Sequence, residues 1–274
     1  MDLRSVDHDR YLELGRVVTG EVMERVFGEW RRARSTCGGG LVWFLRDLWA
    51  GAGWGVVDAA GAPKAAWYSL RRAFRPLAIH VSDEGNNGLA LHVCNDRPEP
   101  FQGRLELALF RAGEVPVGRG EIAVDVGPHA QIELPAAAAF DGFLDLSYAY
   151  RFGPPPYDVL AATLRRSDGP AGDVAASAFH FPAGLPATRE LDVGLAAEAT
   201  LDDAGAHLTV RTRRFAQSVA IDCEGFAPED AFFHLAPGDA RVVRLSRKSN
   251  GAVLKGSVKA LNSEATARIA VATP

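Results

Sequence analysis

Residues 37–76 read CGGGLVWFLRDLWAGAGWGVVDAAGAPKAAWYSLRRAFRP, and four of the five tryptophans of the chain lie in this stretch. Within it, residues 41–45 form the uninterrupted apolar run LVWFL, which comes after three glycines. Such a run is typical of a strand buried on both faces, as in a parallel sheet covered by helices. The glycine-rich segment 51–55 then indicates a loop.

A helix is predicted after this loop. Pro63 suits the first turn of a helix, and the residue before Pro76 resists the helical region, so the helix should end there. Apolar residues recur between these prolines at helical spacing: Ala65, Ala66, Trp67, Leu70, Ala73 and Phe74. The stretch therefore predicts a strand, a loop and a helix.

This block resembles the end of the catalytic barrel in glycoside hydrolase family 2, and within it the β-mannosidase branch. That branch carries a pattern like G-x-L-V-W-Q-L-N-D-x-W-P-G-x-x-W-x-x-x-D, followed by G-x-P-K-x-x-Y-Y-x-L-R-R. Matching residues are Gly39, Leu41, Val42, Trp43, Leu45, Asp47, Trp49, Gly51, Trp54, Asp58, Gly61, Pro63, Lys64, Tyr68, Leu70, Arg71 and Arg72. Phe44, Arg46 and Ala50 depart from the pattern, replacing the amide, the Asn and the Pro.

The resemblance implies that the block is the eighth strand and eighth helix of a (β/α)8 barrel. Active sites of such barrels lie at the carboxyl ends of the strands. Trp43, Asp47 and Trp49 are therefore expected to bind substrate, with the indole of Trp43 as a flat wall against the sugar. Without the resemblance, a core position would be the better interpretation of Trp43, since large aromatic side chains mostly pack in cores.

No catalytic residue is expected in this chain. Retaining glycosidases use two carboxylates about 5 Å apart, and the resemblance implies two glutamates upstream of the matched block. Only 36 residues precede Cys37, whereas a barrel takes about 250 residues. Asp47 and Asp58 match non-catalytic positions, and we expect them to cap loops.

Residues 1–36 are predicted to be helical. Val18, Val22, Val26 and Trp30 recur at intervals of four, with charged residues on the other side. Thr19 is the expected N-cap. In the family this segment resembles the helix that precedes the eighth strand.

From residue 77 onward the hydrophobic period changes to two, which predicts short strands separated by turns. The expected strands are 77–82, 89–95, 104–111, 121–126, 130–134, 144–152, 158–165, 175–181, 191–201, 207–213, 218–222, 241–245, 253–262 and 266–271. A bridge at 182–188 divides them. Segment 225–238, GFAPEDAFFHLAPG, resembles the terminal immunoglobulin-like module of the family, although Ala231 replaces an Asn.

The predicted fold class is mainly β: two immunoglobulin-like β-sandwiches preceded by a partial (β/α)8-barrel remnant of helix, strand and helix. The expected domains are residues 1–76 for the remnant, 77–184 for the first sandwich and 185–274 for the C-terminal sandwich.

Composition excludes several classes of partner. The net charge of −4 over 274 residues makes no electrostatic case for nucleic acid or an anionic membrane. Neither a signal peptide nor a membrane span is recognised, and three scattered cysteines favour reduced thiols, so a cytoplasmic location is expected. The histidines lack metal-ligand spacing, and no phosphate-binding glycine motif occurs, so no metal or cofactor is expected.

These observations leave three functional hypotheses. The first is the C-terminal fragment of a retaining β-mannosidase-like hydrolase, inactive alone, whose partners would be a β-mannoside and an upstream chain or domain that completes the barrel. The second is a stand-alone immunoglobulin-like module that binds carbohydrate or protein, with residues 1–76 as a helical cap. The third, a structural array, leaves the Trp-rich block unexplained and ranks last.

Overall fold

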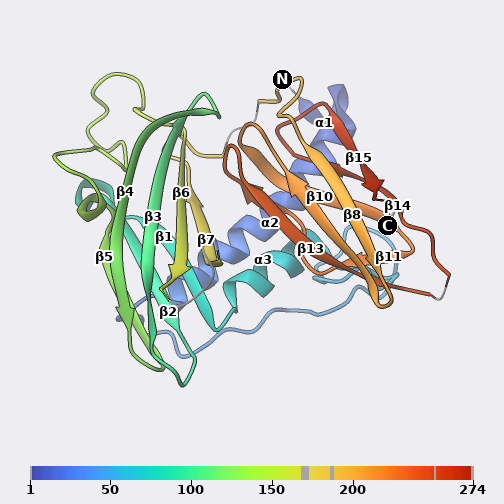
Figure 1. Cartoon of the computed structure of the whole chain (residues 1–274), viewed down its shortest axis with the longest axis horizontal. Helices are drawn as coiled ribbons and strands as arrows, with labels where there is room; N and C mark the ends of the chain where they lie inside the picture. Colours follow the sequence, from blue (N-terminus) through green and yellow to red (C-terminus); the bar gives the residue numbers. More distant parts are fainter. Residues whose placement is uncertain (1, 168–172, 186–187, 250, 273–274) are drawn as a thin grey trace.

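The computed structural model describes residues 2–167, 173–185, 188–249 and 251–272. Helices α1 (Leu3–Val6), α2 (His8–Arg31) and α3 (Ala65–Ala73) come first, and strands make up most of the chain after residue 76. Two groups of strands stand side by side, and α2 runs behind both of them (Figure 1). The predicted mainly β class is confirmed.

The first group of strands forms two layers around one core. One layer has the order β1-β2-β5 and the other β4-β3-β6-β7, with all pairs antiparallel. Alternate residues of β3, among them Leu105 and Leu107, point into the core beside Leu91 and Leu160. The bounds are β1 (Leu77–Asp83), β2 (Leu89–Asn95), β3 (Phe101–Arg111), β4 (Val115–Val126), β5 (Ala130–Pro135), β6 (Val159–Arg166) and β7 (Val174–His180), with short 3-10 helices η1 (Gly85–Asn87) and η2 (Ala136–Ala139).

The second group forms one eight-stranded sheet around a separate core that includes Leu208, Val219, Phe226 and Leu245. Its order is β11-β13-β9-β8-β15-β14-β10-β12, and β15 pairs with β8 in parallel. The bounds are β8 (Ala196–Asp202), β9 (Gly205–Arg211), β10 (Ala216–Glu224), β11 (Phe226–Pro228), β12 (Phe233–Leu235), β13 (Ala240–Arg247), β14 (Lys255–Lys259) and β15 (Thr266–Val271). The predicted bridge at 182–188 includes residues 186 and 187, which lie outside the described residues.

The strand predicted at 144–152 is wrong: this segment is a loop. The Asp145 carboxylate accepts hydrogen bonds from the backbone N–H groups of Ala149 and Tyr150, at 2.9 and 3.0 Å. Tyr148 and Arg151 both have a φ of 53°, which a strand does not allow. A local carboxylate turn therefore replaces ladder hydrogen bonding where the sequence alternates like a strand.

Helix α2 begins earlier than predicted. Asp7 is its N-cap and accepts a hydrogen bond from the backbone of Arg10 at 3.0 Å. Thr19 lies inside the helix, where its hydroxyl donates to the Arg16 carbonyl. Because serine and threonine can bond the preceding turn of a helix, such a residue does not by itself mark a start.

Helix α2 joins both groups of strands. Near its start, Glu13 pairs with Lys259 of β14, and Arg10 donates to the Leu261 carbonyl. At its other end Arg31 pairs with Asp96 at 2.7 Å, beside the first sandwich. Glycine permits close packing in between, because a Cβ at Gly28 would lie 2.8 Å from the Nδ1 atom of His80. The helix therefore holds the two groups in one arrangement.

Among the described residues, no helix is long and apolar enough to cross a membrane.

Candidate functional site

The Trp-rich block does not form the strand predicted at residues 41–45. Leu41, Trp43 and Leu45 are 99, 78 and 64% exposed, and the only regular pairing near them among the described residues is a bridge from Arg46 to Val57. A strand of this composition needs hydrogen-bonded neighbours on both edges and packing on both faces. Among the described residues, Val56 and Val57 donate to the carbonyls of Phe44 and Leu45 along one edge, at 3.4 and 2.9 Å, and Val42 packs against the small core around Phe27. With Leu41, Trp43 and Leu45 left exposed, the segment crosses the surface as irregular chain.

Asp47 closes the loop after this segment. It is buried, and its Oδ1 atom accepts the Gly55 N–H at 2.7 Å while its Oδ2 atom pairs with Lys64. Glycine is required at 53 and 55, since a Cβ at either position would collide with the Asp47 carboxylate. The hydrogen bond from Lys64 is the largest influence on the pKa of Asp47 and holds it below its ordinary value.

Asp58, the other aspartate of the block, also accepts a backbone hydrogen bond. Its Oδ1 atom receives the Ala62 N–H at 2.8 Å across the turn that leads to α3. Both aspartates thus serve as backbone acceptors, as their sequence positions suggested. No group of three His, Cys, Asp or Glu side chains within the described ranges is arranged to hold a metal ion.

Trp43 and Trp49, the two predicted sugar-binding tryptophans, are both on the surface. Their side chains are 78 and 75% exposed. In the part of the chain that the structure describes, the ring contact of Trp43 is with its neighbour Phe44, at 6.5 Å between centroids. Asp47 lies between them in sequence but points into its own loop. That these three residues bind substrate stays a prediction.

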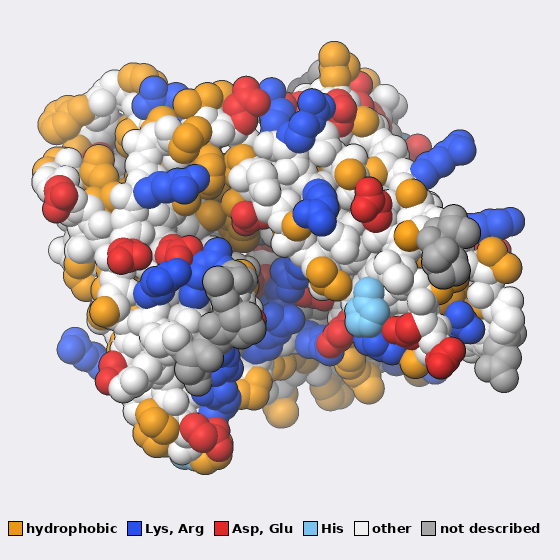
Figure 2. All heavy atoms as spheres, viewed as in Figure 1, with side chains coloured by type: hydrophobic (Ala, Val, Ile, Leu, Met, Phe, Trp, Pro, Cys, Tyr) orange, Lys and Arg blue, Asp and Glu red, His pale blue; other side chains and the backbone are white. Residues whose placement is uncertain are grey.

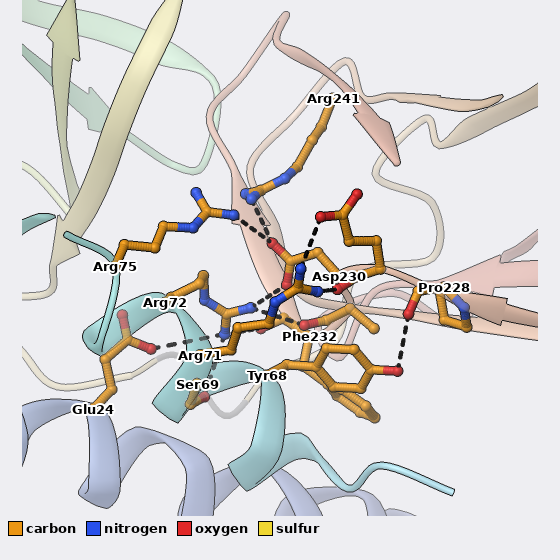
Figure 3. Close-up of polar contacts among 12 residues, drawn as sticks. Glu24, Tyr68, Ser69, Arg71, Arg72, Arg75, Pro228, Asp230, Phe232 and Arg241 are labelled. Atoms are coloured by element: carbon orange, nitrogen blue, oxygen red, sulfur yellow. Dashed lines mark hydrogen bonds and ion pairs between the residues drawn. The ribbon is translucent and has the colours of Figure 1, made fainter. Parts of the chain in front are cut away.

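A cluster of arginines around Asp230 ties α3 to the second sheet (Figure 3). The Asp230 carboxylate, only 9% exposed, lies 2.7 Å from Arg72 and 3.7 Å from Arg75, and it also pairs with Arg241. Arg72 donates further to the carbonyls of Ala231 and Phe232, at 2.9 and 3.1 Å. The two family-like segments, the LRR of α3 and the APEDAFF segment, are thus in direct contact.

A cleft between the two groups of strands is the second candidate site. Figure 2 shows this face of the molecule hollowed between the two halves, with charged side chains gathered in the hollow. A cleft of about 700 Å³ is lined by residues of α2, α3, β1, β2, β7, β10, β12 and β13. Its polar residues include Glu21, His80, His180 and His234.

Sequence reasoning missed this cleft. Glu21 lies on the polar side of a predicted helix, and His80 and His180 each stand in a separate strand with no shared motif. Residues so far apart in the chain carry no spacing signal, because tertiary packing alone brings them together. The Asp230 cluster is equally invisible in the sequence, where Arg71 and Arg72 belong to one family-like segment and Asp230 to another.

Comparison with known proteins supports a glycosidase relationship. No family model matches the chain. The chain is 25% identical to β-mannosidase B of Aspergillus niger over 265 residues, which cover 88% of this chain and 30% of that protein. It is 36% identical to β-mannosidase B of Emericella nidulans over 101 residues, which cover 36% of this chain and 12% of that protein.

Solved structures show the same fold. The β-D-mannosidase of Dictyoglomus thermophilum matches with a TM-score of 0.74 and 19% identity, over 94% of this chain and 30% of that one. The exo-chitosanase of Amycolatopsis orientalis matches with a TM-score of 0.68 and 14% identity, over 93% of this chain and 34% of that one. The chain therefore has the mainly β fold found in a part of such glycosidases.

The resemblance predicted from the Trp-rich block is confirmed. The chain resembles the C-terminal portion of β-mannosidase-like glycoside hydrolases, and it spans about 30% of the length of the Aspergillus niger relative.

Proposed function

We propose that this chain is the C-terminal portion of a retaining β-mannosidase-like glycoside hydrolase of family 2. In this proposal residues 1–76 complete a catalytic barrel, residues 77–184 and 185–274 are two immunoglobulin-like domains, and both catalytic glutamates belong to the preceding part of the enzyme. The complete enzyme would hydrolyse terminal β-mannosides. Trp43, Asp47 and Trp49 would border the sugar, with Asp47 acting through the loop that it closes.

The exposed apolar surface of residues 1–76 carries this proposal. Leu48, Trp49 and Trp54 are 81, 75 and 76% exposed, in addition to Leu41 and Trp43. On α2 the predicted apolar stripe also faces outward: Val18 is 50% exposed and Val22 55%. Large apolar side chains exposed in such number mark an interface. The sequence of this surface resembles the family's, and it suits one partner: the remaining strands and helices of a barrel.

The stand-alone module is the alternative. It requires residues 1–76 to form a finished cap, in which the apolar stripe of α2 and the Trp-rich segment are covered. The exposure of Leu41, Trp43 and Trp49 favours the barrel-completing role instead.

Hydrolysis of an aryl β-mannoside tests the proposal directly. The chain alone should show no turnover, because the proposal puts both reacting carboxylates elsewhere. Turnover that survives purification and heat controls would refute the proposal. The coding sequence immediately upstream of Met1 provides a second test: a continuing frame with both glutamate-bearing strands supports the proposal, and an unrelated or closed frame favours the module.

Hydrogen exchange separates the two roles in solution. In the barrel-completing role, amides of residues 38–50 should exchange rapidly in the isolated chain, except that of Asp47, whose N–H donates to the Val57 carbonyl at 3.0 Å, whereas those of β3 and β6 should be protected. Strong protection throughout residues 38–50 would instead support the finished cap of the stand-alone module.

A further inference from the structure

The cleft between the two groups of strands has the dimensions of a small-molecule site. Its volume is about 700 Å³, and ligand pockets usually measure roughly 300–1,000 Å³. Its walls come from α2 and α3, from β1, β2 and β7 of the first group of strands, and from β10, β12 and β13 of the second. Because α2 is held at both ends by ion pairs, to Lys259 and to Asp96, these walls keep their relative positions.

Four residues that line this cleft have a buried polar atom without a hydrogen-bond partner in the described chain; one of these atoms, Nδ1 of His92, lies 3.6 Å from the Glu133 carboxylate, and the other three have no ion pair either. They are the Oε1 atom of Glu21, the Nε2 atom of His80 and the Nε2 atom of His180. Folded proteins pair the large majority of such atoms, and each one left unpaired costs about 1–3 kcal/mol. Three unpaired atoms from three different elements that line one cleft indicate a site built to receive hydrogen bonds from a ligand.

The ionisation of these groups favours a neutral ligand. Burial lowers the pKa of His80 and of His180 to about 4, so both imidazoles are neutral at pH 7. A neutral imidazole has one donor and one acceptor. Burial also raises the pKa of Glu21 to about 7, so a large part of this carboxyl is protonated and can donate. Groups that both donate and accept match hydroxyl groups, which do the same.

Four of the charged side chains that line the cleft, Glu24, Glu29, Arg72 and Arg241, form ion pairs, whereas Arg25 and Asp83 form none with the described residues. Glu24 lies 3.7 Å from Arg72. Arg72 and Arg241 both pair with Asp230. Glu29, at the other end, lies 3.1 Å from Arg32. The lining arginines Arg25, Arg72 and Arg241 equal in number the lining acids Glu24, Glu29 and Asp83, so the walls carry no strong excess of either charge.

Aromatic rings form part of the same cleft. Phe179 and Phe181 lie 5.2 and 5.5 Å from the His234 ring, between centroids. The Nδ1 atom of His234 accepts the Ser218 N–H at 3.0 Å, which leaves the ring proton on Nε2. Trp30 lines the cleft and is 38% exposed. Apolar ring faces beside a few polar groups suit a molecule with both C–H and O–H surfaces.

We propose that this cleft binds a neutral, hydroxyl-rich ligand of mono- or disaccharide size, with Glu21, His80 and His180 as its hydrogen-bond partners. The inference stands independently of the proposed hydrolase function, because none of its three hydrogen-bonding residues belongs to the Trp-rich block. It predicts binding by the chain even where the chain catalyses nothing.

Titration of the full chain tests the proposal. Calorimetry and ligand-observed NMR would use methyl β-D-mannoside and methyl β-D-glucoside as neutral probes, with glucosamine and glucuronate as charged probes. We expect at least one neutral glycoside to bind and neither charged sugar to bind more tightly. Binding of neither neutral probe, or clearly tighter binding of a charged sugar, would overturn the proposal.

Substitutions then locate the ligand. His180→Phe keeps a ring of similar size and Glu21→Leu removes the carboxyl; each should weaken binding about tenfold, the equivalent of roughly 1.4 kcal/mol. Glu198→Gln, on an exposed position of β8 outside the cleft, is the matched control and should bind as the parent does. Glu21→Gln keeps the shape and most hydrogen bonds if the leucine variant unfolds, and should retain most of the affinity.

Two results would reject the cleft as the location. One is unchanged affinity in a folded His180→Phe variant, with folding checked by circular dichroism. The other is loss of binding in Trp43→Ala while Glu21→Leu still binds, which would put the sugar at the Trp-rich block.

Discussion

Asp230 forms ion pairs with three arginines at the junction of α3 and the second sheet. Its carboxylate is nearly buried and contacts Arg72, Arg75 and Arg241. Removing one partner of a buried pair leaves the remaining charges uncompensated, which costs more than the pair itself contributes. The cluster therefore tolerates loss of its central acid poorly.

Asp230→Ala should lower the free energy of unfolding by roughly 3 kcal/mol, measured by urea unfolding followed by circular dichroism. The neighbouring pair of Arg71 and Glu229 is the control, because both side chains are about half exposed, at 45 and 53%. Glu229→Ala should cost no more than about 0.5 kcal/mol beyond the backbone effect. Equal costs for the two variants would contradict the central role of Asp230 in the cluster.

Glu21 makes the folded state less stable as pH rises. Its pKa in the folded chain is about 7, against 4.5 ordinarily, chiefly because burial disfavours the carboxylate. Between these values the unfolded chain has lost the proton and the folded chain retains it, so stability falls as pH rises from about 4.5 to 7. Glu21→Gln should remove this loss and stabilise the chain at pH 8 by roughly 1–2 kcal/mol, with allowance for solvent screening. Thermal unfolding of the parent and the variant at pH 5 and pH 8 measures this stabilisation. An equal shift of the unfolding temperature at both pH values would contradict the prediction.

At the scale of elements, the Trp-rich segment and α3 differ in what supports them. Leu70 and Ala73 of α3 pack with Phe27 of α2 and Val56 in a small core. Leu41, Trp43 and Trp49 have little cover. Substitutions in the Trp-rich segment should therefore change self-association but hardly change stability, whereas substitutions in the core of α3 should lower stability.

The triple variant Leu41→Ser, Trp43→Ser and Trp49→Ser should change the unfolding free energy by about 0.5 kcal/mol or less, since exposed side chains contribute little to folding. It should also reduce self-association and dye binding, because it removes exposed apolar surface. Leu70→Ala, in the buried core, should cost about 2–5 kcal/mol. Light scattering measures the self-association, and thermal unfolding measures the stability of both variants. A triple variant as unstable as Leu70→Ala would show that the segment is packed in solution.

At the scale of the whole molecule, partly or fully buried histidines gather where the two groups of strands meet. Burial lowers the pKa of His80 and of His180 to about 4, and that of His234 to about 3. The pKa of His92 is lowered as well, again chiefly by burial. A histidine with a lowered pKa binds its proton in the unfolded chain first, so stability is lost as pH falls below about 6.5.

The two groups of strands should therefore separate or unfold in acid. The unfolding temperature should fall steadily between about pH 6.5 and 4.5, and small-angle scattering should report an expanded chain before the secondary structure is lost. His180→Phe should weaken this dependence, whereas His207→Gln, at a half-exposed position of β9, should not. A flat stability profile over this pH range would contradict the prediction.

The local hydrophobic pattern was sufficient to predict most strands, because successive side chains of a strand alternate between core and surface within one segment. The predicted 89–95 and 266–271 match β2 and β15. It failed at 144–152, where Asp145 forms a turn, and at 41–45, where Leu41, Trp43 and Leu45 of the apolar run are exposed. For the candidate site, the resemblance of the sequence indicated Trp43, Asp47 and Trp49. It could not show that the Asp47 carboxylate already accepts the Gly55 N–H and pairs with Lys64.

By itself, the sequence determined the mainly β class, the family resemblance and the apolar character of residues 37–76, because these depend on residue type and spacing along one segment. Only the tertiary structure decided which apolar surfaces are covered, which arginines surround Asp230, and that Glu21, His80 and His180 line one cleft. Burial and pairing between distant residues arise from packing in three dimensions, which a pattern along the chain does not record.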